Sequence, residues 1–401
     1  MRVLFVAEAV TLAHFARPAA MATALAQRWH DDVVLAVAGS ASEHLRVASP
    51  VRQLSLPGIG AVAFARALKS GGPVCNAKDL ARFVEDDMRL FEEIRPDVVV
   101  GDFRLSLSVS ARIAALPYVA IANAYWSPSS SLPLPLPVLD WTAQVPLPIA
   151  QALFGLGRRI VVPRHTRPLN KVRVDHGLPS LGNDLRRTYT DADFVVYADD
   201  ASIFMLKDLP ESHRCIGPIV WAPNVELPSW WPEFRRDCAV IYVTMGSSGS
   251  TDVLTSTLSA LAQLDVTIIA STAGARLPDG AKWPNVHVAP FLPGNRAAEV
   301  STLVVCNGGS MACQQSFLAG RPVLGIAHNM DQFLNMSGVV AAGAGLCLRA
   351  DRATGRAVKE AALKLLGVQS FTTSAAELGC RMAGADPAAG LREVLLRATA
   401  R

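Results

Sequence analysis

The sequence is poor in charge, and its positive and negative residues nearly balance. Charged residues make up 18% of the 401 positions, and the formal net charge is +4. Without a basic tract interleaved with aromatic residues, the sequence argues against a nucleic-acid-binding protein. Hydrophobic residues make up 51%, which is typical of large buried cores and too high for a disordered chain.

Paired cysteines and long apolar runs are also missing. The seven cysteines are scattered and include no Cys-x-x-Cys pair, which predicts reduced thiols rather than a disulfide framework or a zinc site. No run of about 18 apolar residues could span a membrane. Glu8 ends the first apolar run too early for a secretory leader. We therefore expect a soluble, cytoplasmic protein with no bound metal.

The chain alternates short apolar runs with helical patterns, which is typical of α/β domains with doubly wound parallel sheets. A length of 401 residues favours two such domains. We predict an N-terminal domain over 1–221, a linker over 222–237, a C-terminal domain over 238–385, and a last helix over 386–401 that packs back toward the N-terminal domain. The strands predicted in the first half are 3–7, 32–39, 51–56, 97–101 and 118–122, and its first helix is 18–29.

Two glycine-rich turns in the second half follow predicted strands. The strand 302–306 runs into Asn307-Gly308-Gly309-Ser310, and a helical pattern follows. Glycines let a backbone approach a ligand closely, and free amides at a helix start attract an anion. On local sequence alone, a tight turn without a ligand has equal weight. A second turn, Gly246-Ser247-Ser248, offers further amides and hydroxyls, but it matches no phosphate-binding motif by itself.

Together with their surroundings these turns resemble the donor-binding segment of bacterial natural-product glycosyltransferases of the UDP-glycosyltransferase superfamily. The resemblance covers nearly the whole chain. It implies a GT-B fold, in which two Rossmann-like parallel-sheet domains face each other across a cleft, and a UDP- or dTDP-linked sugar donor. The segments that carry it are Asn307–Pro322, Asn329–Asn335, Gly343–Gly345, Thr244–Ser247, Asp102–Arg104 and Ala124–Pro128.

By this resemblance each part of the donor has its own contacts. Gly308, Gly309 and Ser310 would hold the diphosphate, Asp331 and Gln332 would bond the sugar hydroxyls, and the loop with Phe291 and Leu292 would hold the base. Three positions depart from the commonest family pattern: Asn307 replaces His, Ala312 replaces Thr and Gln315 replaces Glu. Gln315 can still accept from ribose hydroxyls through its carbonyl oxygen. We favour a subgroup with altered nucleotide preference over a weakened donor site.

The candidate general base is His14, which follows the first predicted strand. Asp102 follows the fourth strand, and in the doubly wound order 3-2-1-4-5 these two strands are neighbours. A histidine oriented by a carboxylate suits removal of a proton from an acceptor hydroxyl, and the resemblance implies the same roles. Two alternatives stay open: Arg104 could pair with Asp102 instead, or His14 could be an isolated loop residue.

The acceptor side is expected in the N-terminal domain. Tyr125 and Trp126 could stack on a flat acceptor, and Leu136 lies in a proline-rich loop over 132–148 before an apolar segment over 149–162. The alternative is that these residues pack the domain's own core. A basic cluster beside them leaves open a peripheral contact with a membrane surface. Its members are Arg158, Arg159, Arg164 and Arg167.

The predicted function is an inverting, metal-independent glycosyltransferase. It would move a hexose from a nucleotide sugar to a hydroxyl of a small lipophilic or aromatic acceptor, as a monomer or a homodimer, without a bound cofactor. Three alternatives remain: a glycosyltransferase for a membrane-lipid acceptor, a nucleotide-sugar epimerase of the same fold, and a non-catalytic binding or partner protein. The departures at Asn307, Ala312 and Gln315 keep the last alternative open.

Overall fold

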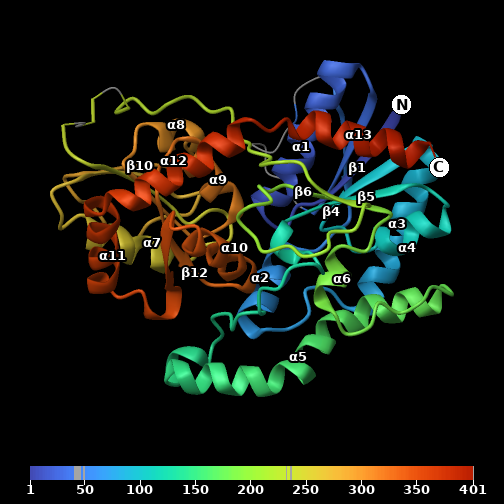
Figure 1. The fold of residues 1–401 in the computed structure, drawn as a ribbon, viewed down its shortest axis with the longest axis horizontal. Coiled ribbons are helices and arrows are strands. Elements are labelled where there is room, and N and C mark those ends of the chain that lie inside the picture. Colours follow the sequence, from blue (N-terminus) through green and yellow to red (C-terminus); the bar gives the residue numbers. More distant parts are fainter. Residues whose placement is uncertain (40–46, 48–49, 232, 235–236, 401) are drawn as a thin grey trace. The chain divides into compact units, whose positions relative to one another are not determined.

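A computed structural model describes residues 1–39, 47, 50–231, 233–234 and 237–400 (Figure 1). The predicted linker over 222–237 lies partly outside these ranges. The chain forms two compact units. The first comprises Met1–Leu132, Val145–Ile219 and the segment from Asp386 on, and the second comprises Pro133–Gln144 and Val220–Ala385.

The first unit is built on a seven-stranded sheet in the order β3-β2-β1-β4-β5-β6-β7. All its neighbouring strands pair in parallel. The central strands are nearly continuous Val, Ile, Leu and Ala runs, as expected where helices cover both faces of a sheet. The strands are β1 (Arg2–Glu8), β2 (Asp32–Ala38), β3 (Arg52–Leu56), β4 (Val98–Asp102), β5 (Tyr118–Ala122), β6 (Phe194–Tyr197) and β7 (His213–Cys215).

The helices of the first unit include the last one of the chain. Helix α13 packs on α1 and on the central strands of this unit, and Arg28 binds the carboxylate of Asp386 with two hydrogen bonds of 2.7 and 2.6 Å. The helices are α1 (Leu12–Trp29), α2 (Ala61–Ser70), α3 (Ala77–Ile94), α4 (Leu107–Ile113), α5 (Leu147–Asp175), α6 (Leu185–Tyr189) and α13 (Pro387–Thr399), with a 3₁₀ turn at Ala124–Trp126.

The second unit repeats the architecture with six parallel strands in the order β10-β9-β8-β11-β12-β13. Its strands are β8 (Val240–Thr244), β9 (Thr267–Ser271), β10 (Val286–Ala289), β11 (Leu303–Cys306), β12 (Val323–Ala327) and β13 (Gly345–Arg349). Its helices are α7 (Thr251–Leu261), α8 (Gly294–Glu299), α9 (Ser310–Leu318), α10 (Met330–Ala341), α11 (Gly355–Gly367) and α12 (Gln369–Ala383), with 3₁₀ turns at Thr142–Gln144 and Ala350–Arg352.

The predicted fold class is confirmed, and three local expectations need correction. Helix α1 begins at Leu12 rather than at Pro18, so His14 lies in its first turn and not in a loop. The loop predicted over 132–148 ends before Leu147, where the long helix α5 begins and takes in the apolar segment 149–162. Residues 133–144 cluster with the second unit, because Arg349 donates to the carbonyl of Leu136 at 2.7 Å and Thr142 donates to Asp351 at 2.8 Å.

Candidate active site

The first unit brings His14 and Asp102 together. Asp102 is the last residue of β4, and it pairs in register with Ala7 of the neighbouring strand β1, which leads into α1. The His14 Nδ1 atom lies 2.7 Å from Asp102 Oδ1. The carboxylate is buried, whereas the imidazole is 21% exposed. Because an ionised carboxylate can only accept, Nδ1 donates the hydrogen bond, and Nε2 is the nitrogen available to take a proton.

A buried arginine, which the sequence analysis missed, holds the Asp102 carboxylate from its other side. Arg17 Nε donates to Asp102 Oδ2 at 2.8 Å, and Arg17 Nη2 donates to Oδ1 at 2.9 Å. Burial is the largest influence and would lower the pKa of Arg17, but the charge and hydrogen bonds of Asp102, together with Tyr125 and Asp199, outweigh it and the pKa is raised. Arg17 stands one helical turn after His14, so its placement could be foreseen only with α1 starting before His14.

The hydrogen-bonded chain continues through the next two strand ends. Arg17 Nη1 donates to Asn123 Oδ1 at 2.6 Å, directly after β5. The Asn123 amide donates to both oxygens of Asp199, which follows β6, at 3.2 and 3.1 Å. Asp199 also accepts from the backbone amide of Ala124 at 2.6 Å. The loops after β4, β5 and β6 are therefore locked around the His14–Asp102 pair.

Arg104 does not pair with Asp102, which resolves the alternative left open by the sequence. Its guanidinium instead binds Glu8 and Asp87, each at 2.9 Å, and all three side chains are buried. Burial raises the pKa values of Glu8 and Asp87, and the Arg104 charge opposes that rise. Phe103, between Asp102 and Arg104, has a φ of 59°, a strained value for a bulky residue.

Aromatic rings fix the imidazole from the side. The Phe103 ring stacks on His14 with centroids 4.6 Å apart and an interplanar angle of 20°. Tyr189 lies 5.4 Å from Phe103 and 4.9 Å from Trp126. Of the residues expected at the acceptor, Trp126 is half-buried, whereas Tyr125 is fully buried. Tyr125 thus packs the core of the first unit, and its ring has no face open to an acceptor.

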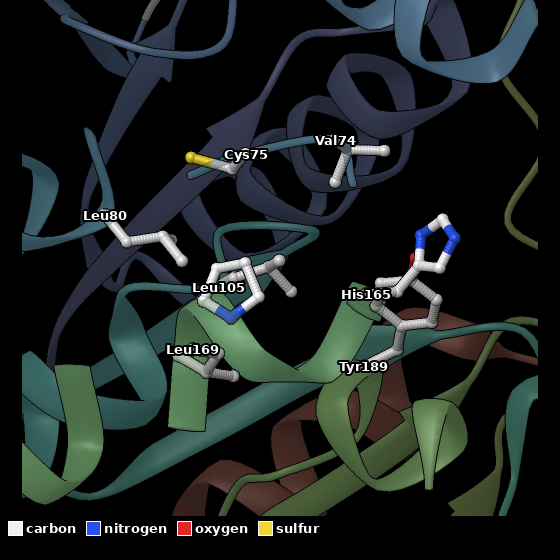
Figure 2. Close-up of a pocket in the computed structure, with 8 residues that line it drawn as sticks. Val74, Cys75, Leu80, Leu105, His165, Leu169 and Tyr189 are labelled. Atoms are coloured by element: carbon white, nitrogen blue, oxygen red, sulfur yellow. The ribbon is translucent and has the colours of Figure 1, made fainter. Parts of the chain in front are cut away.

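Leu136 is also buried, and it belongs to the second unit, whereas Tyr125 and Trp126 belong to the first. Tyr189 also lines a small pocket of the first unit, whose lining side chains Figure 2 shows. Because Tyr189 contacts Phe103, one ring separates this pocket from the imidazole of His14. The lining is mainly apolar and consists of Val74, Cys75, Leu80, Leu105, His165, Pro168, Leu169 and Tyr189.

In the second unit, the turn after β11 is shaped for close approach. Gly308 has a φ of +79°, and a Cβ at this residue would lie 2.6 Å from Met336 Cγ. Asn335 donates to the Gly308 carbonyl at 2.9 Å and fastens the turn to α10. Helix α9 then begins at Ser310 with Gly309 as its N-cap. The first amides of a helix have no partner within it, so this helix start can donate to an anion.

Asn307 links the two glycine-rich turns. Its Oδ1 atom accepts from the Gly309 amide at 3.1 Å, and its Nδ2 atom donates to Ser248 Oγ at 3.2 Å. Ser248 follows β8, the strand next to β11. In the same turn Gly246 has a φ of +60°, and Ser247 is exposed. The residue that replaces the family's histidine therefore keeps the turn in shape through neutral bonds.

Gln332 is committed to the start of helix α10. It forms a capping box with Asn329, and its Oε1 atom accepts from the His328 amide at 2.8 Å. Only its amide nitrogen, 3.5 Å from Ser248 Oγ, remains near the turns, and the side chain is buried. Asp331, beside it, is half-buried. Of this predicted sugar-binding pair, Asp331 is therefore the more accessible.

The remaining predicted donor residues also lie in the second unit. Gln315 Nε2 donates to the Trp221 carbonyl at 2.7 Å, so its carbonyl oxygen is the atom left to accept from a ligand. Gln315 also packs so close to Gly294 that a Cβ there would collide with its side chain. Phe291 is half-buried and Leu292 is buried.

The two doubly wound parallel sheets define the GT-B class of fold. The erythromycin biosynthesis protein CIII-like C-terminal domain matches residues 255–395. Two solved structures share the fold. Spinosyn forosaminyltransferase matches with a TM-score of 0.70 and 18% identity, over 100% of both chains. Spinosyn rhamnosyltransferase complexed with thymidine diphosphate matches with a TM-score of 0.68 and 20% identity, over 98% of this chain and 100% of that one.

Relatives by sequence are named for one biosynthesis. A PGL/p-HBAD biosynthesis rhamnosyltransferase of Mycobacterium bovis is 42% identical over 94% of this chain and 83% of its own length. A PGL/p-HBAD biosynthesis glycosyltransferase of Mycobacterium tuberculosis is 41% identical over 94% of this chain and 87% of its own length. A third, from Mycobacterium bovis, is named inactive and is 39% identical over 65% of this chain and 70% of its own length. The chain belongs to this family of glycosyltransferases, which confirms the resemblance to natural-product glycosyltransferases.

Proposed function

We propose that this glycosyltransferase transfers a deoxyhexose of the rhamnose type from a dTDP-linked donor to a hydroxyl of a lipophilic or aromatic acceptor. The observation that carries the proposal is the His14–Asp102 pair at 2.7 Å, whose imidazole remains partly exposed. The sugar follows the name of the 42% identical relative, and the nucleotide follows the thymidine diphosphate complex of the fold neighbour. A UDP-linked donor is the alternative that the experiment below separates.

His14 acts as the general base. Its Nε2 atom takes the proton of the acceptor hydroxyl, while Asp102 holds Nδ1 protonated and stabilises the imidazolium that forms. Arg17 fixes the carboxylate by two hydrogen bonds and is a positioning residue. The acceptor oxygen attacks the anomeric carbon as the bond from that carbon to the diphosphate oxygen breaks. This single displacement inverts the anomeric configuration.

The leaving dTDP is stabilised by the turn after β11. Its electron pair and charge come to rest on the diphosphate, where the amides at the start of α9 can donate to it. Ser310, at the first position of that helix, adds a hydroxyl. Because these donors are neutral and preformed, the proposed mechanism needs no metal ion.

The acceptor is proposed to be lipophilic because aromatic rings lie beside His14, beginning with Phe103, which stacks on the imidazole. Tyr189 contacts Phe103, and the half-buried Trp126 contacts Tyr189 in turn. A flat phenolic ring or an alkyl chain suits these rings, whereas a strongly hydrated acceptor would lose its water on entry without hydrogen bonds in return.

The test is a transfer assay with dTDP-rhamnose and UDP-rhamnose against phenols and aliphatic alcohols of graded alkyl length, in the presence of EDTA. We expect release of dTDP, a rhamnosylated product with inverted anomeric configuration by NMR, and higher kcat/KM as the alkyl chain lengthens. Retained configuration, loss of turnover in EDTA, or turnover with neither donor in any acceptor mixture would overturn the corresponding part of the proposal. If neither donor gives turnover with any acceptor, the chain would be inactive, as the relative named inactive is said to be.

A further inference from the structure

The first half of helix α5 exposes a stripe of large apolar side chains. Ile149, Leu153, Leu156 and Ile160 are 54, 53, 79 and 65% exposed. Their spacing of four, three and four residues places them on one face of the helix. In Figure 1, α5 runs along the lower edge of the drawing. A contiguous apolar face of this kind on a protein surface marks an interaction site more often than isolated exposed residues do.

The second half of α5 packs against the rest of the first unit. Thr166, Leu169, Val172 and Arg173 are buried, and α5 packs on α3. Arg173 is ion-paired with Asp191. The core of the first unit is therefore completed by the second half, and the exposed stripe of the first half serves no packing need within this unit.

The charged residues of the chain segment that carries the stripe have one sign. Between Asp140 and Asp175 the sequence contains no Asp or Glu, yet it contains six Lys and Arg residues. Four of these arginines are exposed: Arg158, Arg159, Arg164 and Arg167. A helix with an apolar stripe and flanking cations matches the boundary of a lipid layer, where apolar side chains enter the acyl region and arginines meet anionic head groups.

A neighbouring helix extends the cationic surface. His165 of α5 hydrogen-bonds the backbone of Gly71, directly after α2. Helix α2 has no acidic residue, its Val62 is 75% exposed, and Arg66 and Lys69 are exposed beside it. Helix α2 and the first half of α5 thus present apolar and basic side chains without an acidic one.

We propose that the face formed by α2 and the first half of α5 docks on the surface of an anionic lipid bilayer. The helices would lie in the interface rather than cross it, and in the described part of the chain no helix is long and apolar enough to span a membrane. A second copy of the chain is a poorer occupant. A symmetric contact would bring the same arginines against one another.

The test is co-sedimentation of the full chain with vesicles of phosphatidylcholine alone and of phosphatidylcholine mixed with phosphatidylglycerol. We expect binding to the mixed vesicles that weakens as salt is added. Leu153→Gln/Leu156→Gln should lower the partition coefficient by about tenfold or more. Arg158→Gln/Arg159→Gln should lower it by about fivefold per arginine, the attraction of one basic side chain to an anionic surface.

Matched controls come from the second unit. Leu363→Gln removes an equally exposed leucine (53%), and Arg276→Gln removes an exposed arginine (88%), so both should leave the partition coefficient within about twofold. All variants should retain the circular dichroism spectrum and the turnover of a short water-soluble acceptor. Absence of binding to anionic vesicles would overturn the proposal, as would binding that the α5 variants leave unchanged. A dimer in sedimentation velocity that Leu153→Gln/Leu156→Gln dissociates would instead assign the stripe to a second copy.

Discussion

The side chains that follow the central strands are charged in the first unit and neutral in the second. After β4, β5 and β6 the first unit joins charged groups: Asp102, held by Arg17, and Asp199, held by Asn123. After β8 and β11 the second unit joins neutral ones, because Asn307 bridges Ser248 and the Gly309 amide. The same doubly wound sheet thus supports a charged, hydrogen-bonded cluster in one unit and a neutral set of hydrogen-bond donors in the other.

Under the proposed function, the difference follows from where each substrate carries its charge. An acceptor hydroxyl brings no charge, so the base that deprotonates it needs a fixed carboxylate to stabilise the imidazolium. A nucleoside diphosphate brings its own negative charge, which amides at a helix start can hold without a cationic side chain. Asn307, where the resemblance leads us to expect His, is therefore compatible with the proposed diphosphate site.

The largest expected effect is on the charged side. His14→Ala should lower kcat by about a hundredfold to ten-thousandfold, the contribution of a positioned general base. The affinity for dTDP should stay within about twofold, since His14 belongs to the other unit. Initial rates at saturating donor and acceptor give kcat, and Tm checks that the variant is folded. A variant with unchanged kcat would remove His14 from the mechanism.

On the neutral side, Asn307→Asp should weaken dTDP binding by about tenfold to a hundredfold. The carboxylate can still accept from the Gly309 amide and can now accept from the Ser248 hydroxyl, but it places a negative charge beside the diphosphate. Asn307→His is the matched control, and it should bind dTDP at least as tightly as the natural chain. Equal affinity of both variants would show that the diphosphate lies elsewhere. Isothermal titration calorimetry measures both.

A smaller effect separates positioning from stability in the first unit. Arg17→Lys keeps a positive charge but loses the bidentate hydrogen bonding to the Asp102 carboxylate. We expect kcat to fall about tenfold with the KM values for both substrates nearly unchanged, and Tm to fall as well. If Tm falls while kcat stays the same, Arg17 is a structural ion-pair partner only.

The smallest expected effect is on the pH dependence of Tm. Burial lowers the pKa of His165, and its hydrogen bond to Gly71 opposes that shift. The unfolded chain therefore holds the proton more tightly, so this contribution to stability is complete above about pH 6.5 and is lost as the pH falls. His165→Gln should flatten the fall of Tm below that pH by on the order of 1–2 °C. His30→Asn, at an exposed helix end, should not, and an unchanged slope in His165→Gln would remove this residue from the acid response.

Much of the fold could be predicted from sequence, because parallel strands that are buried on both faces have continuous apolar sequences. The adjacency of β1 and β4 then followed from the doubly wound order, and it placed Asp102 beside the start of α1. Arg17 was missed for a local reason. Proline is favoured in the first turn of a helix, so Pro18 suggested a helix start that lies six residues too late.

Other parts of the site depended on tertiary contacts that no local pattern carries. The local sequence does not distinguish Arg104 from Arg17 as a partner of Asp102. Only the tertiary packing determines which of them binds its carboxylate. Gln332 looks like a free ligand, yet its carbonyl oxygen is taken by the capping box of α10. Tyr125 looks like an acceptor platform, but it is wholly buried in the first unit.

The division of roles between the two units is tested most directly by one calorimetric series: dTDP titrated, without magnesium, into the natural chain, His14→Ala and Asn307→Asp. The account predicts equal affinity for the natural chain and His14→Ala, and an affinity lower by about tenfold or more for Asn307→Asp. It is contradicted if His14→Ala loses dTDP binding while Asn307→Asp keeps it. In that case the diphosphate would depend on the charged site of the first unit and not on the glycine-rich turn of the second.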